Sequence, residues 1–281
     1  MSTTDTAAAA GPQPFTLPRK PHYVTLAADC DFFALFQKIE RHFDTCYMLE
    51  SLGEDSHMAR HSIIGFDPEY TLYANGHTLT IENRDGQAEQ YTSENPYELL
   101  RSLIPQNIIS RKYAGGLSGY LGYDAMQYFE PSLTLKASDD FDTFRFGLYK
   151  DGLILDKMTG EVTYFYYDNS RYAFLQTLID ADDEPAGPLH ITALGDTMSK
   201  AEHAEAVAKV KQDIIDGKVF QCEVGFKKRF RIQGDTLALY EQLRTINPSP
   251  QMYYVKFGEQ KLIGASPELL FRLRQGEMET F

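Results

Sequence analysis

The most informative stretch of the sequence is Ile263-Gly264-Ala265-Ser266-Pro267-Glu268-Leu269-Leu270. It combines the composition of a buried strand with a Ser-Pro turn that presents a carboxylate. A carboxylic acid in that position suits a site that protonates a leaving hydroxyl. Taken alone, however, an ordinary strand that ends at a proline is the better interpretation. The choice between the two therefore depends on the rest of the chain.

Length and composition predict a globular protein. The chain has 281 residues, enough for one large domain or two ordinary ones. Apolar residues make up 43% and charged residues 24%, which excludes a disordered chain and a membrane-spanning one. With 40 acidic and 27 basic residues the net charge is -13, which opposes nonspecific binding to nucleic acid or to anionic lipid.

The N-terminal residues and the three cysteines indicate the cellular compartment in which the protein is expected. Residues 1–20 are predicted to be a disordered tail, and their short alanine run is not a signal peptide, so we expect a cytoplasmic protein. Cys30, Cys46 and Cys222 lie far apart and are odd in number. This spacing favours buried thiols over a zinc site or a redox pair.

The first part of the chain has the pattern of antiparallel sheets with flanking helices. Asn75-Gly76 and Asp85-Gly86 are typical of tight β-hairpins. A further hairpin is expected across Lys150-Asp151, between strands at 144–149 and 152–156. The other expected elements are helices at 32–42, 96–104 and 170–182 and strands at 47–50, 60–66 and 161–167. Together they predict an α+β fold and a first domain over 21–184.

A linker and a second domain are expected to follow. Residues 185–197 begin with a Pro- and Gly-rich run that predicts a linker, and 198–281 form the second domain. Its first helix has a capping box at Ser199 and Glu202 and ends at Gly217. A strand is predicted at 219–226, with Gln221 and Glu223 on its polar face. Later strands are expected at 251–257, 261–265, 269–273 and 278–281.

A series of motifs, in order and at plausible spacing, resembles those of anthranilate synthase component I, one of the chorismate-utilising enzymes. The motifs are Leu49-Glu50-Ser51, Arg60-His61-Ser62-Ile63-Ile64-Gly65, the glycine-rich run from Gly115 to Asp124, the run from Gly217 to Phe230, Asn247-Pro248-Ser249-Pro250 followed by Met252, and Ala265-Ser266-Pro267-Glu268. The resemblance spans the chain from about Leu49 to its end. It implies the family's β-rich regulatory half followed by the start of its catalytic half.

The resemblance implies a binding site for tryptophan as feedback inhibitor in that first half. Carried over by motif, Glu50 and Ser51 contact tryptophan together with Pro250, Gln251 and Met252. Two departures lower the expected affinity. Gln251 stands where the family usually has tyrosine, and His61 also replaces a tyrosine.

The resemblance also assigns two catalytic residues. Glu268 is expected to be the general acid that protonates the departing C4 hydroxyl of chorismate, which requires a neutral carboxyl in an occluded site. The resemblance implies that relatives which add water to chorismate have lysine at the position of Gln221, where the amine can deprotonate the water. Ammonia needs no such base, so Gln221 favours the amine-adding branch of the family.

The family's subunits continue beyond this point with a catalytic histidine and two glutamates that hold Mg2+. The resemblance therefore covers a little over half of a full subunit and implies a C-terminally truncated chain with an incomplete second half. We expect no metal ligand within these residues and no chorismate turnover by the chain alone.

Three functions compete at this stage. The first is the large subunit of anthranilate synthase, which makes anthranilate and pyruvate from chorismate and ammonia supplied by a glutamine amidotransferase partner. The second is aminodeoxychorismate synthase component I, of the folate pathway. The third is a non-catalytic tryptophan-binding protein.

Overall fold

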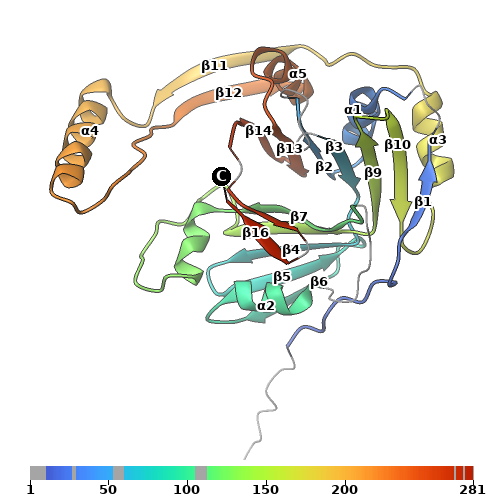
Figure 1. Cartoon of the computed structure of the whole chain (residues 1–281), viewed down its shortest axis with the longest axis horizontal. Helices are drawn as coiled ribbons and strands as arrows, with labels where there is room; N and C mark the ends of the chain where they lie inside the picture. Colours follow the sequence, from blue (N-terminus) through green and yellow to red (C-terminus); the bar gives the residue numbers. More distant parts are fainter. Residues whose placement is uncertain are drawn as a thin grey trace, which may run out of the picture. The chain divides into compact units, whose positions relative to one another are not determined.

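Two antiparallel sheets contain most of the strands among the described residues (Figure 1). The computed structural model describes residues 11–26, 30–52, 60–104, 113–268, 270–274 and 276–280. The strands of the larger sheet are β1 (His22–Thr25), β2 (Thr45–Glu50), β3 (His61–Phe66), β9 (Asp151–Asp156), β10 (Glu161–Tyr166), β13 (Gln251–Phe257) and β14 (Gln260–Ser266). They lie in the order β1-β10-β9-β3-β2-β13-β14.

The smaller sheet has five strands, three of which are joined by consecutive hairpins. Its strands are β4 (Tyr70–Asn75), β5 (Thr78–Asn83), β6 (Ala88–Thr92), β7 (Gly116–Leu121) and β8 (Phe144–Tyr149), in the order β6-β5-β4-β8-β7. The hairpins predicted at Asn75-Gly76 and Asp85-Gly86 are confirmed as the β4–β5 and β5–β6 turns. Both glycines adopt positive φ, as the turn requires. The predicted α+β class with antiparallel sheets is confirmed.

The two sheets pack against each other through aromatic side chains. Tyr47 of β2 and Val255 of β13 share one buried cluster with Tyr149 of β8. The rings of Tyr47 and Tyr149 meet edge to face, with 4.8 Å between their centroids. Burial raises the pKa of both hydroxyls well above the ordinary value, so they stay protonated. The hydroxyl of Tyr47 hydrogen-bonds that of Tyr113.

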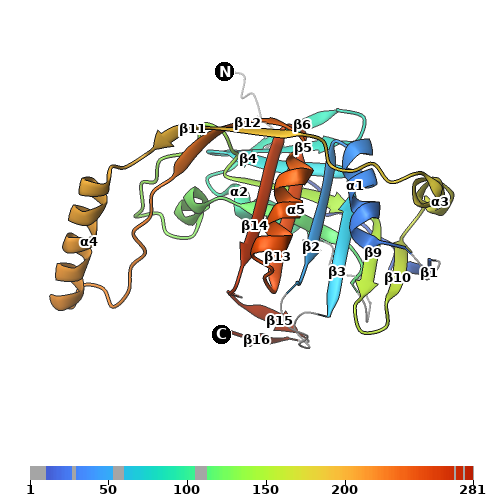
Figure 2. The ribbon, with the colours of Figure 1, turned by 90° about the horizontal axis from the view of Figure 1, so that it is seen from above.

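Helices cover the outer faces of the sheets. α1 (Phe32–His42) begins at Asp31, whose carboxylate accepts from the backbone N–H groups of Phe33 and Ala34. It lies against β2 in the view of Figure 2, and its Phe36 ring packs edge to face on Tyr254. The remaining helices of this part are α2 (Pro96–Leu103), the 3-10 helix η2 (Tyr123–Tyr128) and α3 (Tyr172–Asp180). α2 and η2 enclose the second core, on the five-stranded sheet.

The glycine-rich motif serves the close packing of β7 on β8. A Cβ atom at Gly119 would lie 2.0 Å from the carbonyl oxygen of Arg145, so no other residue fits there. Gly115 adopts a φ of +72°, and a Cβ there would lie 2.4 Å from the carbonyl oxygen of Tyr149. Glycine is therefore required at both positions, because the backbone of β8 lies too close for a Cβ atom.

The hairpin predicted across Lys150-Asp151 is wrong. β8 pairs with β4 and β7, whereas β9 pairs with β3 and β10, so the chain passes from one sheet to the other at this point. The pair Lys150-Asp151 lacks the Gly or Asn that a two-residue hairpin turn favours. Its side chains have other partners: Lys150 Nζ lies 2.8 Å from Glu69 and 3.0 Å from Asp168.

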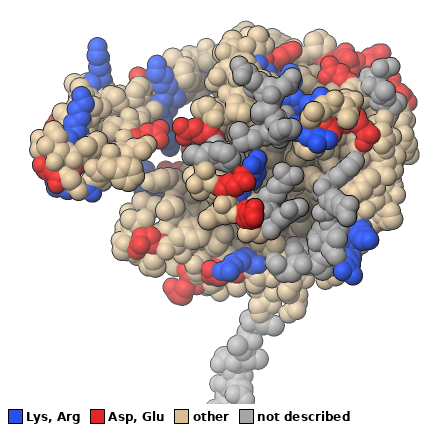
Figure 3. Space-filling model, in the orientation of Figure 1, with Lys and Arg blue, Asp and Glu red and all other residues tan. Residues whose placement is uncertain are grey.

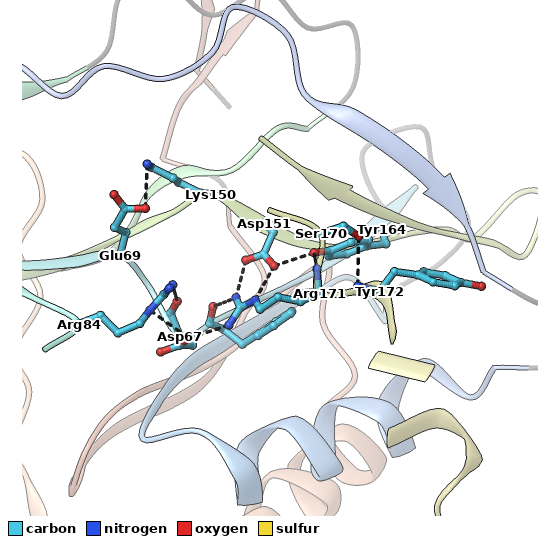
Figure 4. Close-up of polar contacts among 10 residues, drawn as sticks. Asp67, Glu69, Arg84, Lys150, Asp151, Tyr164, Ser170, Arg171 and Tyr172 are labelled. Atoms are coloured by element: carbon cyan, nitrogen blue, oxygen red, sulfur yellow. Dashed lines mark hydrogen bonds and ion pairs between the residues drawn. The ribbon is translucent and has the colours of Figure 1, made fainter. Parts of the chain in front are cut away.

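Arg171 holds this crossing in place (Figure 4). Its guanidinium makes two hydrogen bonds to the buried carboxylate of Asp151, at 2.5 and 2.8 Å, and another at 2.6 Å to Asp67. Tyr164 donates a further hydrogen bond to Asp151 at 2.8 Å. The guanidinium also stacks 4.4 Å from the ring centroid of Phe66. One residue thus ties β3, β9 and β10 to the start of α3.

The chain divides into two compact units, and the division differs from the predicted one. The first comprises the described residues of Met1–Glu184 together with Leu243–Phe281, and the second is Pro185–Gln242. Residues 243–281, which the sequence assigns to a second domain, belong with the first because β13 pairs with β2. The predicted tail also differs. Residues 1–10 lie outside the described residues, but Leu17 is only 2% exposed and Phe15 bonds to Leu103.

The second unit contains β11 (Leu189–Asp196), α4 (Lys200–Ile215) and β12 (Lys228–Gly234), and the division falls within α5 (Thr236–Ile246). The predicted linker at 185–197 therefore includes a strand, β11, which pairs with β12. The helix predicted after Ser199 is confirmed, with the capping box formed and Gly217 at a φ of +73°.

The strand predicted at 219–226 is wrong. Residues 221–227 have no regular secondary structure, and Phe220 is 92% exposed. Within the described second unit the only ladder is β11–β12, and β12 begins at Lys228. Alternation of side chains gives a strand its faces, but a strand also needs a hydrogen-bonded neighbour. After β14 the chain forms a short ladder of β15 (Arg272–Arg274) and β16 (Glu277–Glu279), while residues 269 and 281 lie outside the described residues.

Surface charge is unevenly distributed. Figure 3 shows acidic atoms gathered at the upper right, on the side where α3 lies in Figure 1. Asp180, Asp182, Asp183 and Glu184 form an exposed run at and after the end of α3, in which Asp183 pairs with Lys38 at 2.8 Å. No helix within the described residues has the length and apolar composition needed to span a membrane.

Replacing Arg171 with leucine should lower the free energy of unfolding by about 3 kcal/mol, because the substitution leaves the buried carboxylate of Asp151 without its cation. Urea unfolding followed by circular dichroism measures the change. Lys218→Leu is the control, since Lys218 pairs with Asp213 and Asp216 at the surface and should matter little. Equal effects of the two substitutions would contradict the role given to Arg171.

Acid should weaken the pairing of β3 with β9. Hydrogen bonds from Arg60 lower the pKa of Asp156 from 3.8 to about 2. A folded-state pKa below the unfolded one stabilises the fold above about pH 4, and this contribution is lost as the pH falls toward about 2. The stability difference between the wild type and Arg60→Gln should therefore shrink between about pH 6 and pH 2. A constant difference in urea unfolding across that range would refute this.

Candidate functional site

The pairing of β2 with β13 brings two distant motifs together. β2 ends at Glu50, and its Cα partner on β13 is Met252. Both side chains are buried, at 4% and 2% exposure. Side chains alternate along a strand, so Glu50 lies on the same face as Met48 and Cys46. The Leu49-Glu50-Ser51 motif therefore lies beside Pro250 and Met252, about 200 positions later in the chain.

Hydrogen bonds fasten the two segments just beyond the paired strands. The hydroxyl of Ser51 donates to the carbonyl oxygen of Pro250 at 2.6 Å. The backbone N–H of Leu52 donates to the carbonyl oxygen of Ser249 at 2.9 Å. The ammonium of Lys157 donates to the carbonyl oxygen of Ser51 at 2.5 Å. Four of the five residues assigned to tryptophan, namely Glu50, Ser51, Pro250 and Met252, thus lie together.

The fifth, Gln251, lies between Pro250 and Met252 along the chain. It is the first residue of β13, half-buried, and pairs with Ser266 of β14. His61, the other departure from the family motif, is the exposed first residue of β3 and pairs with Asp156 of β9.

Glu50 is bound by an arginine that the sequence analysis missed. Arg244 Nε lies 2.7 Å from one carboxylate oxygen of Glu50, and Nη2 lies 3.2 Å from the other. The guanidinium also stacks on Phe33 of α1, 3.9 Å from the ring centroid. Such two-point contacts are strong and directional. Arg244 stands three residues before Asn247-Pro248, but no local pattern marks it, because charged residues on helices are usually solvated.

The carboxylate assigned as general acid is exposed. Glu268 follows β14 and Pro267, and its backbone N–H donates to the hydroxyl of Ser266 at 3.4 Å. That hydroxyl donates in turn to the carbonyl oxygen of Glu268 at 3.1 Å. The Ser-Pro turn is as expected, whereas the occluded environment is not present in the structure.

Gln221 is also exposed, in the irregular segment of the second unit. The polar strand face that it was expected to share with Glu223 does not form. Gln221 belongs to the second unit and Glu268 to the first. Among the described residues no group of three or more His, Cys, Asp or Glu side chains is arranged to hold a metal ion.

Known proteins resemble this chain over most of its length. Anthranilate synthase component 1 of Leptospira biflexa is 41% identical over 272 residues, which cover 94% of this chain and 57% of the relative. The protein of the same name from Methanothermobacter marburgensis is 36% identical, covering 89% of this chain and 53% of the relative. The chain thus spans a little over half the length of these relatives.

The fold also matches a solved structure. Anthranilate synthase component I from Streptococcus pneumoniae superposes with a TM-score of 0.61 at 22% identity, over 82% of this chain and 55% of that one. A family model described as chorismate binding enzyme matches residues 44–281, which include both strands that form the site. The chain therefore belongs to the chorismate-binding enzyme family.

Proposed function

We propose that this chain is part of the large subunit of an anthranilate synthase that is inhibited by tryptophan. The observation that carries the proposal is the junction of Glu50 and Ser51 with Pro250 and Met252. Two motifs far apart in sequence meet there with a buried carboxylate, a hydroxyl and an apolar side chain. The names of the relatives support the same activity.

The proposed reaction joins ammonia to chorismate and releases water and pyruvate, leaving anthranilate. Ammonia is itself a nucleophile, and Gln221 has no basic group that would activate water in its place. Glu268 would deliver the proton that the departing hydroxyl needs. Because Glu268 is exposed here, this role requires that bound substrate exclude water from its carboxyl group.

A glutamine amidotransferase subunit is the proposed source of ammonia, since the name component 1 of the relatives implies a second component. Magnesium remains an expectation from the family that no described residue is assigned to hold. The cytoplasmic location also remains a prediction.

Replacing Ser51 with phenylalanine should weaken tryptophan binding by about 10- to 100-fold, because the larger side chain would enter a closely packed junction. Isothermal titration of the chain with L-tryptophan measures the affinity. Ser51→Ala removes only the hydroxyl that bonds to Pro250, so it tests the same site if Ser51→Phe does not fold. The control is Ser102→Phe, at an exposed position of α2. Unchanged affinity in both Ser51 variants would place the inhibitor elsewhere.

Replacing Glu268 with glutamine should lower anthranilate formation about 100- to 10,000-fold in an active subunit that contains this sequence, because the amide cannot deliver a proton. Fluorescence of anthranilate, with chorismate, ammonium and magnesium supplied, reports the rate. Glu277→Gln, at an exposed position of β16, is the matched control. If Glu268→Gln retained full activity, the proton would have to come from another group.

A further inference from the structure

Within the proposed tryptophan site, Glu50 has a particular chemical task. Of the five residues assigned to the effector it alone carries a charge, and its carboxylate is almost fully buried. A buried carboxylate is the natural partner of the ammonium group of an amino acid. Arg244 donates two hydrogen bonds to this carboxylate, at 2.7 and 3.2 Å.

The geometry around Arg244 fixes the direction of that carboxylate. Its fork contacts both oxygens of Glu50, which restrains rotation about the last side-chain bond. Phe33 covers the guanidinium from one side and fixes its plane. Arg244 also lies in the last turn of α5, directly before the Asn247 to Pro250 segment that bonds to Ser51. The same helix end therefore positions both halves of the site.

We propose that Arg244 is a positioning residue for the effector: it orients the carboxylate of Glu50 toward the ammonium group of a bound α-amino acid and does not contact the ligand itself. This inference rests on the proposed function, because it assumes that an amino acid binds at Glu50 and Ser51. It adds Arg244 to the residues assigned to the effector by motif, and it names the ligand group that the ion pair serves.

Three probes separate this role from its alternatives: L-tryptophan, tryptamine, which lacks the carboxylate, and indole, which lacks both charged groups. In Arg244→Met, the affinities for tryptophan and tryptamine should fall by the same factor, about tenfold or more, because both ligands rely on an oriented Glu50. Indole binding should change little. In a Glu50→Gln background the Arg244 substitution should have no further effect on either amine.

Titration calorimetry, or ligand-observed NMR for indole, supplies the affinities. Arg272→Met is the matched control, because it breaks another Arg–Glu pair, between β15 and β16. Arg244→Lys keeps the positive charge but loses the two-point contact, so its affinities for tryptophan and tryptamine should lie between those of the wild type and Arg244→Met. It replaces Arg244→Met in the experiment if that variant does not fold. Circular dichroism checks folding of each variant.

Several outcomes would overturn the proposal. If Arg244→Met weakens all three probes equally, the pair only maintains the fold. If tryptophan weakens far more than tryptamine, Arg244 contacts the ligand carboxylate directly. If no affinity changes, Arg244 has no part in the site. Failure of the wild-type chain to bind tryptophan would be a distinct result, because it removes the proposed effector site as well.

Discussion

The ladder between β2 and β13 is the contact on which the rest of the structure depends. It joins segments about 200 residues apart, from Thr45 with Phe257 to Glu50 with Met252. Closing so long a loop costs conformational entropy, although the cost grows only slowly with loop length. Burial of Tyr47, Val255 and Phe257 between the sheets offsets that cost. The ladder also brings the two motifs of the candidate site together.

Local signals predicted the elements well, and long-range pairing explains what they could not predict. The helix at 32–42 has apolar residues at helical spacing, and the hairpins have Asn-Gly and Asp-Gly turns, so both features could be placed from the sequence. The passage of the chain from one sheet to the other at Lys150 was not evident from the sequence. The residues on either side have the pattern of two strands whether these form a hairpin or belong to different sheets. What selects the crossing is Arg171, twenty residues later, which binds Asp151. Similarly, residues 219–226 alternate as a strand does but have no neighbouring strand in their unit.

The sequence predicted those residues of the candidate site that belong to recognisable motifs. Glu50, Ser51, Pro250 and Met252 were assigned by resemblance, and the strand register brings them together. Arg244 and Lys157 were missed, because a single basic residue on a helix or after a strand gives no sign of its partner in the sequence. The exposure of Glu268 could not be foreseen either, since a motif specifies a residue type and leaves its solvent environment open.

The tyrosine-rich packing between the sheets has an optical consequence. The chain contains 18 tyrosines and no tryptophan, and Tyr47 and Tyr149 lie buried where the two sheets meet. Their emission therefore has no indole within the chain to quench it. If tryptophan binds beside Glu50, as proposed, it would be the sole indole in the complex, and it would lie near Tyr47 of the same strand, β2, from which it could accept excitation energy. The tyrosines of the unlabelled protein would then act as energy donors, and tryptophan bound at the proposed site would shift the ultraviolet emission from phenol to indole.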